Sequence, residues 1–264
     1  MDLGLRDAVV IVQGGSRGMG YAAAECFAAD GAKVGIIGRT QSDLDEAVAA
    51  LRAAGAADVA SFRADIGRAD EVDAAFAAIG ARWGQINTLV NCAGPEVLGG
   101  IEELSDSDWM ESINIGAMGL VRCVRAALPL IRKAEWGRIV NLSAHSIKRQ
   151  TPGLIAYTAS KAMVASISKN LSLSLAPEGI LVNTVLPGSF ASPALKDWAE
   201  RAGYDPNDLV SIMDGIRTHF GHPAHLPRAG EPNEIGPVIA FAGSRRNSYM
   251  TGAFINVDGG SDFS

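Results

Sequence analysis

A glycine-rich turn near the start of the chain joins a short apolar run to a segment of helix-forming residues. The run at 8–12 is β-branched and bounded by glycines, which predicts a buried parallel strand, and residues 21–29 are expected to form the helix. Between them, Gly14, Gly18 and Gly20 follow the spacing G-x-x-x-G-x-G. A tight turn alone would also use glycine, but in this strand–helix setting the backbone N–H groups and the helix dipole face an anion. The unit therefore predicts a phosphate-binding turn of the kind that holds dinucleotides.

The residues after the second expected strand predict which dinucleotide is bound. In NAD-binding folds, an acidic residue about 20 positions after the glycines binds the ribose hydroxyls of the adenosine. Gly38 and Arg39 occupy that place here, and Arg17 adds a second positive charge within the turn. An arginine binds a 2′-phosphate through charge-assisted hydrogen bonds, whereas a carboxylate would repel it. A lone arginine at a strand end is commonly only solvated, but the missing acid and the second arginine together predict NADP(H) over NAD(H).

A tyrosine, a lysine and a serine in the middle of the chain form a candidate acid–base group. Tyr157 and Lys161 are four residues apart, and on a helix such residues share a face, so the phenol and the ammonium would point into the same space. The ammonium would lower the pKa of the phenol from about 10, so that the tyrosine exchanges protons near neutral pH. Ser143 could hydrogen-bond the oxygen whose charge changes during a reaction. Because Tyr-x-x-x-Lys is common by chance, its weight comes from the glycine turn in the same chain.

Apolar strand-like runs alternate with helix-forming segments along the whole chain, without a linker, low-complexity tract or internal repeat. This alternation predicts a single α/β domain over residues 1–264, Rossmann-like, with a doubly wound parallel sheet of about seven strands and helices on both faces. Capping boxes are expected at Ser42 with Asp45 and at Ser105 with Asp108. The expected strands are 8–13, 33–38, 58–62, 86–91, 136–142, 180–186 and 252–256.

Together, these motifs resemble the short-chain dehydrogenase/reductase family, in its single-domain type that includes 3-oxoacyl-carrier-protein reductases. The resemblance covers nearly the whole chain, and the joint order and spacing of the motifs carries it. It implies a Rossmann-like fold and hydride transfer between a nicotinamide cofactor and a carbonyl or alcohol substrate. The residues that carry the resemblance are Gly14, Gly18, Gly20, Asp65, Asn91, Cys92, Ala93, Gly94, Asn114, Ser143, Tyr157, Lys161, Pro187, Gly188 and the closing residues 257–260.

The resemblance implies a catalytic tetrad, and every position of the tetrad is present in the chain. Tyr157 resembles the acid/base, and Lys161 resembles the residue that binds the nicotinamide ribose and lowers the pKa of the tyrosine. Ser143 resembles the group that polarises the substrate carbonyl. Asn114 resembles the helix-kinking asparagine that holds a water molecule for a proton relay.

For the cofactor, the resemblance implies that the side chain of Asp65 contacts the adenine, with Ile66 beside it. Asn91, Ala93 and Gly94 would line the cofactor cleft, and Pro187 and Gly188 would form a turn against the nicotinamide. The complete set of expected cofactor-binding residues is Gly14, Ser16, Arg17, Gly18, Met19, Gly20, Arg39, Asp65, Ile66, Asn91, Ala93, Gly94, Tyr157, Lys161, Pro187 and Gly188.

Two residues depart from the pattern of the family. Gln13 stands where a threonine is usual, whose hydroxyl ties neighbouring strands together. A glutamine amide can also bridge two strands, but it is longer, so the resemblance leaves the local geometry open here. Cys92 stands where a second, largely structural asparagine is common, and its presence leaves the chemistry of the site untouched.

A long segment, residues 189–230, separates the sixth expected strand from the next helix, whereas most such connections have about 2–6 residues. Its apolar and aromatic residues predict an inserted substrate-binding lid, although a packing or oligomer surface would use the same residue types. Phe190 is a candidate substrate residue, and His145 either hydrogen-bonds substrate or only fills space. His222 and His225 are expected to be ordinary lid residues rather than a metal pair, because no acidic or cysteine partner is near in the sequence. No metal site is predicted.

Charge and composition narrow the choice of partners. The net charge of −6 and the pI of about 5.3 argue against a nucleic-acid partner, which needs a basic surface. No apolar run approaches the roughly 20 residues that span a membrane, and the polar, acidic start is unlike a secretion signal. Cys26, Cys92 and Cys123 are scattered, and we expect buried free thiols in a reducing cytoplasm.

The leading hypothesis is an NADP(H)-dependent oxidoreductase that reduces a ketone, or oxidises the matching secondary alcohol, with Tyr157 as the acid/base. A 3-oxoacyl thioester is one candidate substrate, because the apolar lid favours a hydrophobic or acyl-chain molecule. An NAD-dependent dehydrogenase of a steroid or polyol is an alternative that Arg39 argues against. A cofactor-binding sensor without turnover is an alternative from another class, but Tyr157 and Lys161 are both present. By resemblance, we expect a homotetramer or a dimer.

Overall fold

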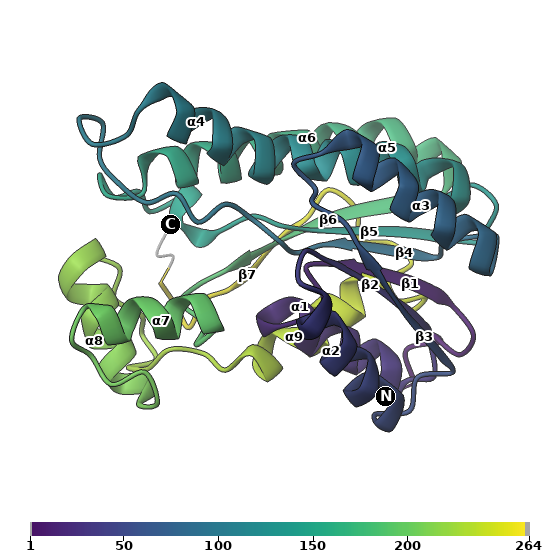
Figure 1. The fold of residues 1–264 in the computed structure, drawn as a ribbon, viewed down its shortest axis with the longest axis horizontal. Helices are drawn as coiled ribbons and strands as arrows, with labels where there is room; N and C mark the ends of the chain where they lie inside the picture. The colour runs from purple at the N-terminus through teal and green to yellow at the C-terminus, as the bar shows by residue number, and fades with distance from the viewer. Residues whose placement is uncertain (1, 262–264) are drawn as a thin grey trace.

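One parallel sheet forms the centre of the computed structural model, which describes residues 2–261. Within these residues the strands are β1 (Val9–Gln13), β2 (Lys33–Gly38), β3 (Asp58–Arg63), β4 (Thr88–Asn91), β5 (Gly137–Leu142), β6 (Ile180–Pro187) and β7 (Phe254–Val257). They pair in the order β3-β2-β1-β4-β5-β6-β7, and every neighbouring pair is parallel (Figure 1). The sheet confirms the predicted fold class. Residues 1 and 262–264, the ends of the expected domain, lie outside the described residues.

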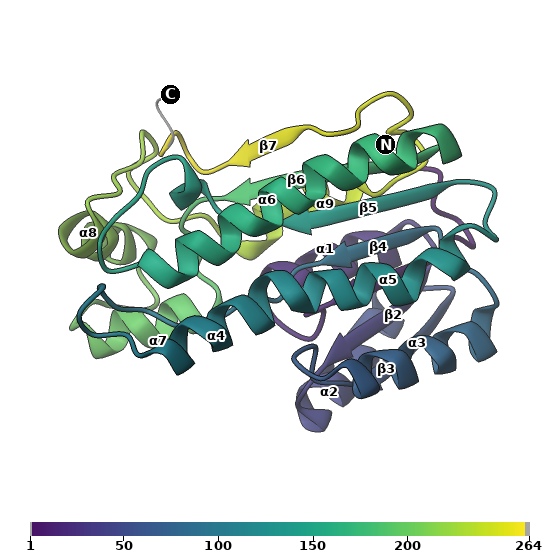
Figure 2. The same ribbon diagram turned by 90° about the horizontal axis from the view of Figure 1, so that it is seen from above.

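Helices cover both faces of the sheet, as a doubly wound fold requires (Figures 1 and 2). On one face lie α1 (Gly18–Ala29), α2 (Gln41–Ala53) and α9 (Pro232–Ala242). On the other lie α3 (Ala69–Trp83), α4 (Asp106–Ile113), the π-helical segment Asn114–Met118, α5 (Gly119–Ile131) and α6 (Ile155–Leu175). Short 3₁₀ segments at His145–Ile147 and Ala176–Glu178 flank α6.

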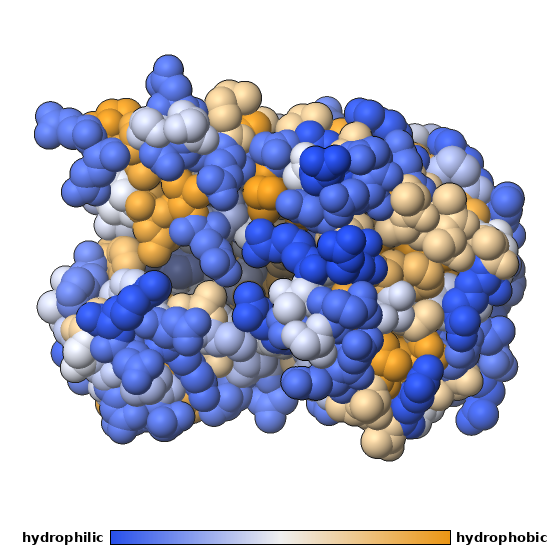
Figure 3. Space-filling model, viewed as in Figure 1, coloured by the Kyte–Doolittle hydropathy of each residue, from blue (hydrophilic) through white to orange (hydrophobic). Residues whose placement is uncertain are grey.

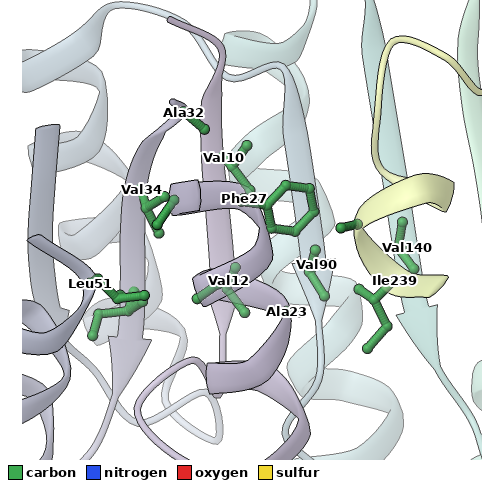
Figure 4. Close-up of a cluster of buried hydrophobic side chains, with 14 of the residues drawn as sticks. Val10, Val12, Ala23, Phe27, Ala32, Val34, Leu51, Val90, Val140 and Ile239 are labelled. Carbon is green, nitrogen blue, oxygen red and sulfur yellow. The ribbon is translucent and has the colours of Figure 1, made fainter. Parts of the chain in front are cut away.

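The hydrophobic core lies on both sides of β1. Val10 and Val12 point toward α1, where they pack in one cluster with Phe27 and with Ile239 of α9 (Figure 4). Ile11 points the opposite way and belongs to the cluster under the other helix layer. Because successive side chains of a strand alternate between faces, a strand with helices on both sides needs apolar residues throughout. This explains why β1 reads as a continuous apolar run.

The turn after β1 brings backbone against backbone. A Cβ atom on Gly20 would lie 2.1 Å from the carbonyl oxygen of Gly14, and one on Gly14 would lie 2.7 Å from the backbone nitrogen of Ala93. Gly14 and Gly18 have φ angles of +76° and +58°, which residues with side chains rarely adopt. The glycines of the motif are therefore required by these contacts and by the backbone conformation, and they leave the N-terminus of α1 open toward the sheet edge.

The two expected capping boxes had different outcomes. Ser105 caps α4 as predicted: its hydroxyl accepts a hydrogen bond from the backbone of Asp108, whose carboxylate accepts one from the backbone of Ser105. The box at Ser42 and Asp45 is wrong, because α2 begins at Gln41 and Ser42 already lies within its first turn. Asp45 instead accepts a hydrogen bond of 2.8 Å from the side-chain amide of Gln41.

A continuous helical stretch runs through α4, the π-helical segment and α5, over Asp106–Ile131. Within residues 2–261 it is the one helix that is long and apolar enough, by length and composition, to cross a membrane. One such helix is weak evidence of a membrane span, because core helices pass the same test. In this fold the stretch packs against α3 and α6 in the helix layer over the sheet (Figure 2).

The segment from 189 to 230, which we call the lid, carries α7 (Pro193–Arg201) and α8 (Leu209–Phe220). Its two ends are joined, because Phe190 and Gly230 form an isolated parallel bridge and Gly230 donates a hydrogen bond to the carbonyl oxygen of Ser189. The lid also has a small core of its own, formed by Ala191, Ala199, Ile212 and Ala229. The segment thus leaves the end of β6 and comes back beside it before α9 begins.

Candidate active site

Two cavities lie side by side at the carboxyl ends of the strands. The first, of about 220 Å³, is lined by the glycine turn, by residues after β2 and β3, and by the loop after β4. The second, of about 540 Å³, is lined by the ends of β5 and β6, by α6 and by the lid. In Figure 3 this face is hollowed between the part that carries α7 and α8, at lower left, and the helix layer above it. The two cavities share Arg17, Met19, Cys92, Gly94, Glu96, Ser192 and Ala194.

Most of the predicted cofactor residues line one of these cavities. On the first are Gly14, Ser16, Arg17, Gly18, Met19, Gly20, Arg39, Asp65, Ile66, Ala93 and Gly94. Tyr157, Lys161, Pro187 and Gly188 line the second. Asn91 lines neither: it is buried, and its amide donates a hydrogen bond of 2.8 Å to the side-chain oxygen of Asn141. It therefore ties β4 to β5 behind the cavities, a position that the sequence could not reveal.

Two arginines stand at the rim of the first cavity. Arg17 and Arg39 are both exposed, and neither forms an ion pair with any residue between 2 and 261. Gly38 lines the cavity where an acid would stand in an NAD-binding site, and Asp43, in the first turn of α2, is a lining residue that sequence reasoning missed. The rim thus offers two positive charges that form no ion pair with the described residues, beside the glycine turn and on the same cavity as Asp43.

The loop after β3 holds Asp65 and Ile66 against the first cavity through short hydrogen bonds. The side chain of Asp65 accepts a bond of 2.8 Å from the backbone of Gly67, and the backbone N–H of Asp65 donates one of 2.9 Å to Glu71. These bonds close a local turn, whose carbonyl oxygens at Ile66 and Gly67 also accept hydrogen bonds from Arg122 and Asn114.

Gln13 bridges the two loops that form the floor of the first cavity. Its side-chain oxygen accepts a hydrogen bond of 3.1 Å from the backbone N–H of Ala93, across 80 residues of sequence. The side chain is 3% exposed and lines the cavity. The glutamine thus does tie β1 to the loop after β4, which was the role expected of a threonine hydroxyl.

The three residues of the candidate acid–base group lie together on the second cavity. The hydroxyl of Ser143 donates a hydrogen bond of 2.8 Å to the backbone oxygen of Lys161, so β5 and α6 are fixed to each other at this point. The ammonium of Lys161 donates one of 3.0 Å to the carbonyl oxygen of Leu142, and it lies 5.8 Å from the ring centroid of Tyr157. The spacing of four residues on one helix therefore does bring the phenol and the ammonium into the same space.

The pKa of Tyr157 moves in the direction opposite to the prediction. Burial, together with the smaller effect of Cys92, raises it to about 12. Burial also lowers the pKa of Lys161 to about 8, because the charged ammonium loses its hydration. The loss of hydration of both groups thus outweighs the attraction between the ammonium and a phenolate, on which the prediction depended. At neutral pH the tyrosine keeps its proton, and the lysine is close to losing its own.

Asn114 begins the π-helical segment and is held on several sides. Its amide donates to the carbonyl oxygen of Gly67 at 3.3 Å, and its side-chain oxygen accepts a bond of 2.7 Å from Arg122. Its backbone oxygen accepts bonds from Arg122, at 3.2 Å, and from the N–H of Gly119. Asn114 does not line either cavity. Arg122 was missed, because nothing in the sequence marks an arginine eight residues away as its partner.

The lid side of the second cavity is largely aromatic and apolar. Phe190, Trp198 and Phe220 line it, and the rings of Trp198 and Phe220 lie 5.1 Å apart. His145, a candidate substrate residue, does not line this cavity; its Nδ1 atom lies 3.1 Å from the carbonyl oxygen of Pro187. His222, expected to be an ordinary lid residue, is buried and does line it. No group of three or more metal-ligating side chains occurs within residues 2–261.

Comparisons with known proteins agree with this geometry. A family model described as enoyl-(acyl carrier protein) reductase matches residues 14–262. The short-chain reductase protein NovJ of Streptomyces niveus is 32% identical over 255 residues, which cover 97% of this chain and 94% of NovJ. The chain belongs to the short-chain dehydrogenase/reductase family. The 3-oxoacyl-[acyl-carrier-protein] reductase of Synechocystis sp. is 32% identical over 253 residues, 96% of each chain.

A solved structure extends the similarity to the whole fold. L-sorbose reductase from Gluconobacter frateurii, complexed with NADPH and L-sorbose, superposes with a TM-score of 0.92 at 28% identity, and 100% of each chain is covered. As a short-chain dehydrogenase/reductase, the present protein is an oxidoreductase that acts on CH–OH and C=O groups. The comparisons confirm the resemblance, the fold class and the reaction class expected from the sequence.

The bridge formed by Gln13 can be tested by removing its acceptor. In Gln13→Leu, the partly buried N–H of Ala93 loses its partner, and we expect the free energy of unfolding in urea to fall by about 1–3 kcal/mol. Gln41→Leu is the matched control, because Gln41 is exposed and bonds only Asp45 on its own helix; we expect a change below about 0.5 kcal/mol. Equal losses in the two variants would show that the bridge contributes nothing.

Proposed function

We propose that the protein reduces a ketone with NADPH, the same site also catalysing the reverse oxidation of a secondary alcohol. One observation carries the proposal: Ser143, Tyr157 and Lys161 line a cavity that shares a wall with the glycine-turn cavity. A dinucleotide fits the residues present. A Cβ on Gly14 or Gly20 would collide with the backbone at this turn, and the two arginines at its rim form no ion pair with the described residues.

Tyr157 is the proton donor in this proposal. Its raised pKa keeps the phenol protonated at neutral pH, which is the form needed to protonate the carbonyl oxygen during reduction. Ser143, on the same cavity, would turn its hydroxyl from the backbone of Lys161 to the substrate oxygen and stabilise the charge that develops there. When bound, NADPH supplies the hydride to the carbonyl carbon.

Lys161 restores the proton of the tyrosine. With a pKa of about 8, its ammonium can release a proton near neutral pH, and its bond to Leu142 keeps it beside the phenol ring. Asn114 acts here as a positioning residue: with Arg122 it fixes the π-helical segment next to α6. The water-holding role that the resemblance implies for Asn114 stays a prediction.

Replacing the phenol hydroxyl tests the assigned acid. We expect Tyr157→Phe to lower kcat by at least about 10²-fold, because the proton donor is lost. NADPH binding, followed by nicotinamide fluorescence, should change less than about threefold, because the ring remains in place. Tyr249→Phe serves as control, since Tyr249 is 99% exposed and lines neither cavity. Turnover retained by Tyr157→Phe would refute the role.

We further propose that NADP(H) is preferred over NAD(H). Arg39 and Arg17 offer two positive charges at the rim of the first cavity, and Gly38 leaves no carboxylate at the position that would repel a 2′-phosphate. The L-sorbose reductase of similar fold was solved with NADPH, which supports the same choice here.

Arg39→Ala separates the two cofactors. Loss of a charge-assisted bond to the 2′-phosphate should weaken NADPH binding by about 10- to 100-fold and leave NADH binding unchanged. Arg52→Ala is the control, because Arg52 is exposed on α2 and does not line the cavity. Equal catalytic efficiency of the wild type with the two cofactors, or a preference for NADH, would contradict the proposal.

We propose that the whole chain is one domain and that the lid, residues 189–230, closes over the substrate. Its joined ends and its aromatic wall support this role. A hydrophobic 3-oxoacyl thioester and a hydroxylated ketone both suit such a cavity. Arg17 and Arg39 count against an NAD-dependent alcohol dehydrogenase, and the assembled group of Ser143, Tyr157 and Lys161 counts against a sensor without turnover.

We propose a cytoplasmic homotetramer. Large apolar side chains on the outer helix layer are exposed, among them Met110 at 62% and Leu173 at 69%, and self-association would cover them. Cys26, Cys92 and Cys123 are all free thiols, which suits a reducing compartment. We expect light scattering after size exclusion to give four times the chain mass of 27.5 kDa. A monomer at micromolar concentration would contradict self-association.

A further inference from the structure

A buried histidine of the lid has no role in the reaction described above. His222 follows the end of α8, is only 2% exposed, and lines the second cavity together with Ser143 and Tyr157. Its Nε2 atom has no hydrogen-bond partner within the described part of the chain. A buried polar atom without a partner costs about 1–3 kcal/mol, and native proteins keep few of them. Such an atom beside a binding cavity points to a missing ligand.

The ring of His222 is held in place by His145 and by the backbone of Arg149 and Gln150. Its centroid lies 4.9 Å from that of His145, and the two rings meet edge to face at 73°. His145 is itself fixed through Nδ1, 3.1 Å from the carbonyl oxygen of Pro187. Because a carbonyl can only accept, Nδ1 of His145 carries the hydrogen. The segments that follow β5 and end β6 therefore also orient the lid histidine.

His222 is neutral at physiological pH. Burial, together with the positive charge of Arg149 and the interaction with His145, lowers its pKa to about 4. A neutral imidazole recognises neutral hydrogen-bonding groups and does not compete for the anionic part of a cofactor. The remaining lid residues on this cavity are either apolar, as Phe190 and Trp198 are, or lie partly or fully exposed, as Asp197 and Arg201 do. His222 is thus the buried polar side chain on the lid wall, among the residues described.

We propose that His222 forms a hydrogen bond with a hydroxyl group of the substrate. This hydroxyl is attached to a different carbon from the carbonyl that Tyr157 and Ser143 contact. A hydroxyl can both donate and accept, so it pairs with Nε2 in either tautomer of the ring. The substrate class is then a hydroxylated ketone, rather than an acyl chain with no polar group beyond its thioester. The inference rests on the proposed ketone reduction and adds the substrate class to it.

Matched pairs of ketones test the inference. Cyclohexanone and its 2-, 3- and 4-hydroxy derivatives differ only in the position of one hydroxyl, so the ratio of their kcat/KM values isolates its recognition. We expect the wild type to favour one hydroxylated isomer by about tenfold. In His222→Phe, which keeps a ring against His145 but lacks the nitrogen, this ratio should fall to about one, while cyclohexanone itself reacts within about threefold of the wild-type rate.

A neighbouring histidine provides the control. His225 is exposed and does not line the cavity, so His225→Phe should keep the wild-type ratio. If His222→Phe melts well below the wild type, His222→Leu replaces it. The inference is overturned if the wild type discriminates no isomer, or if its preference survives in the folded His222 variant.

A binding measurement separates this inference from the proposed reaction. Calorimetric titration of each ketone into the Tyr157→Phe protein saturated with NADPH reports recognition without turnover. We expect the same hydroxylated isomer to bind more tightly than cyclohexanone. This preference should disappear when His222→Phe is combined with Tyr157→Phe. If the wild type reduced no ketone and this binding preference still depended on His222, the proposed reaction would fail and the recognition site would stand. Equal binding of all four ketones would overturn the inference.

Discussion

The contact between the glycine turn and the loop after β4 is the constraint on which the rest of the active site depends. No side chain fits between Gly14 and Ala93, and the amide of Gln13 spans the same gap with a hydrogen bond. This contact places the first residues of α1 beside Cys92 and Gly94, which belong to both cavities. Because the two cavities share these lining residues, a cofactor bound in the first would lie beside a substrate bound in the second.

Burial sets the acid–base properties of the site. Lys161 is 4% exposed. Its pKa is low because the buried environment hydrates the charged ammonium poorly and so favours the neutral amine. Groups buried in this way cost stability and are retained where the chemistry needs them. The same burial keeps Tyr157 protonated, so one physical cause produces both a ready donor and a lysine able to resupply it.

Local patterns were enough to predict the strands, the glycine turn and the pairing of Tyr157 with Lys161. Each depends on the period of a strand or helix, or on the topology of a parallel sheet, and so survives without tertiary detail. The pKa of Tyr157 and the burial of His222 could not be predicted, because both depend on packing between segments far apart in the chain. The cap at Ser42 failed for a smaller reason, since α2 begins two residues earlier, at Gln41, with Thr40 at its N-cap.

The π-helical segment Asn114–Met118 divides a helical stretch whose two halves follow different registers. A π-helical turn contains one residue more than an α-helical turn. This extra residue rotates the side chains that follow it by about 100° about the helix axis, relative to those before it. Removing a single residue here would turn Asn114 away from Gly67 and also turn the whole of α5 on the sheet. In evolution, this part of the chain should therefore tolerate changes of residue type far better than changes of length.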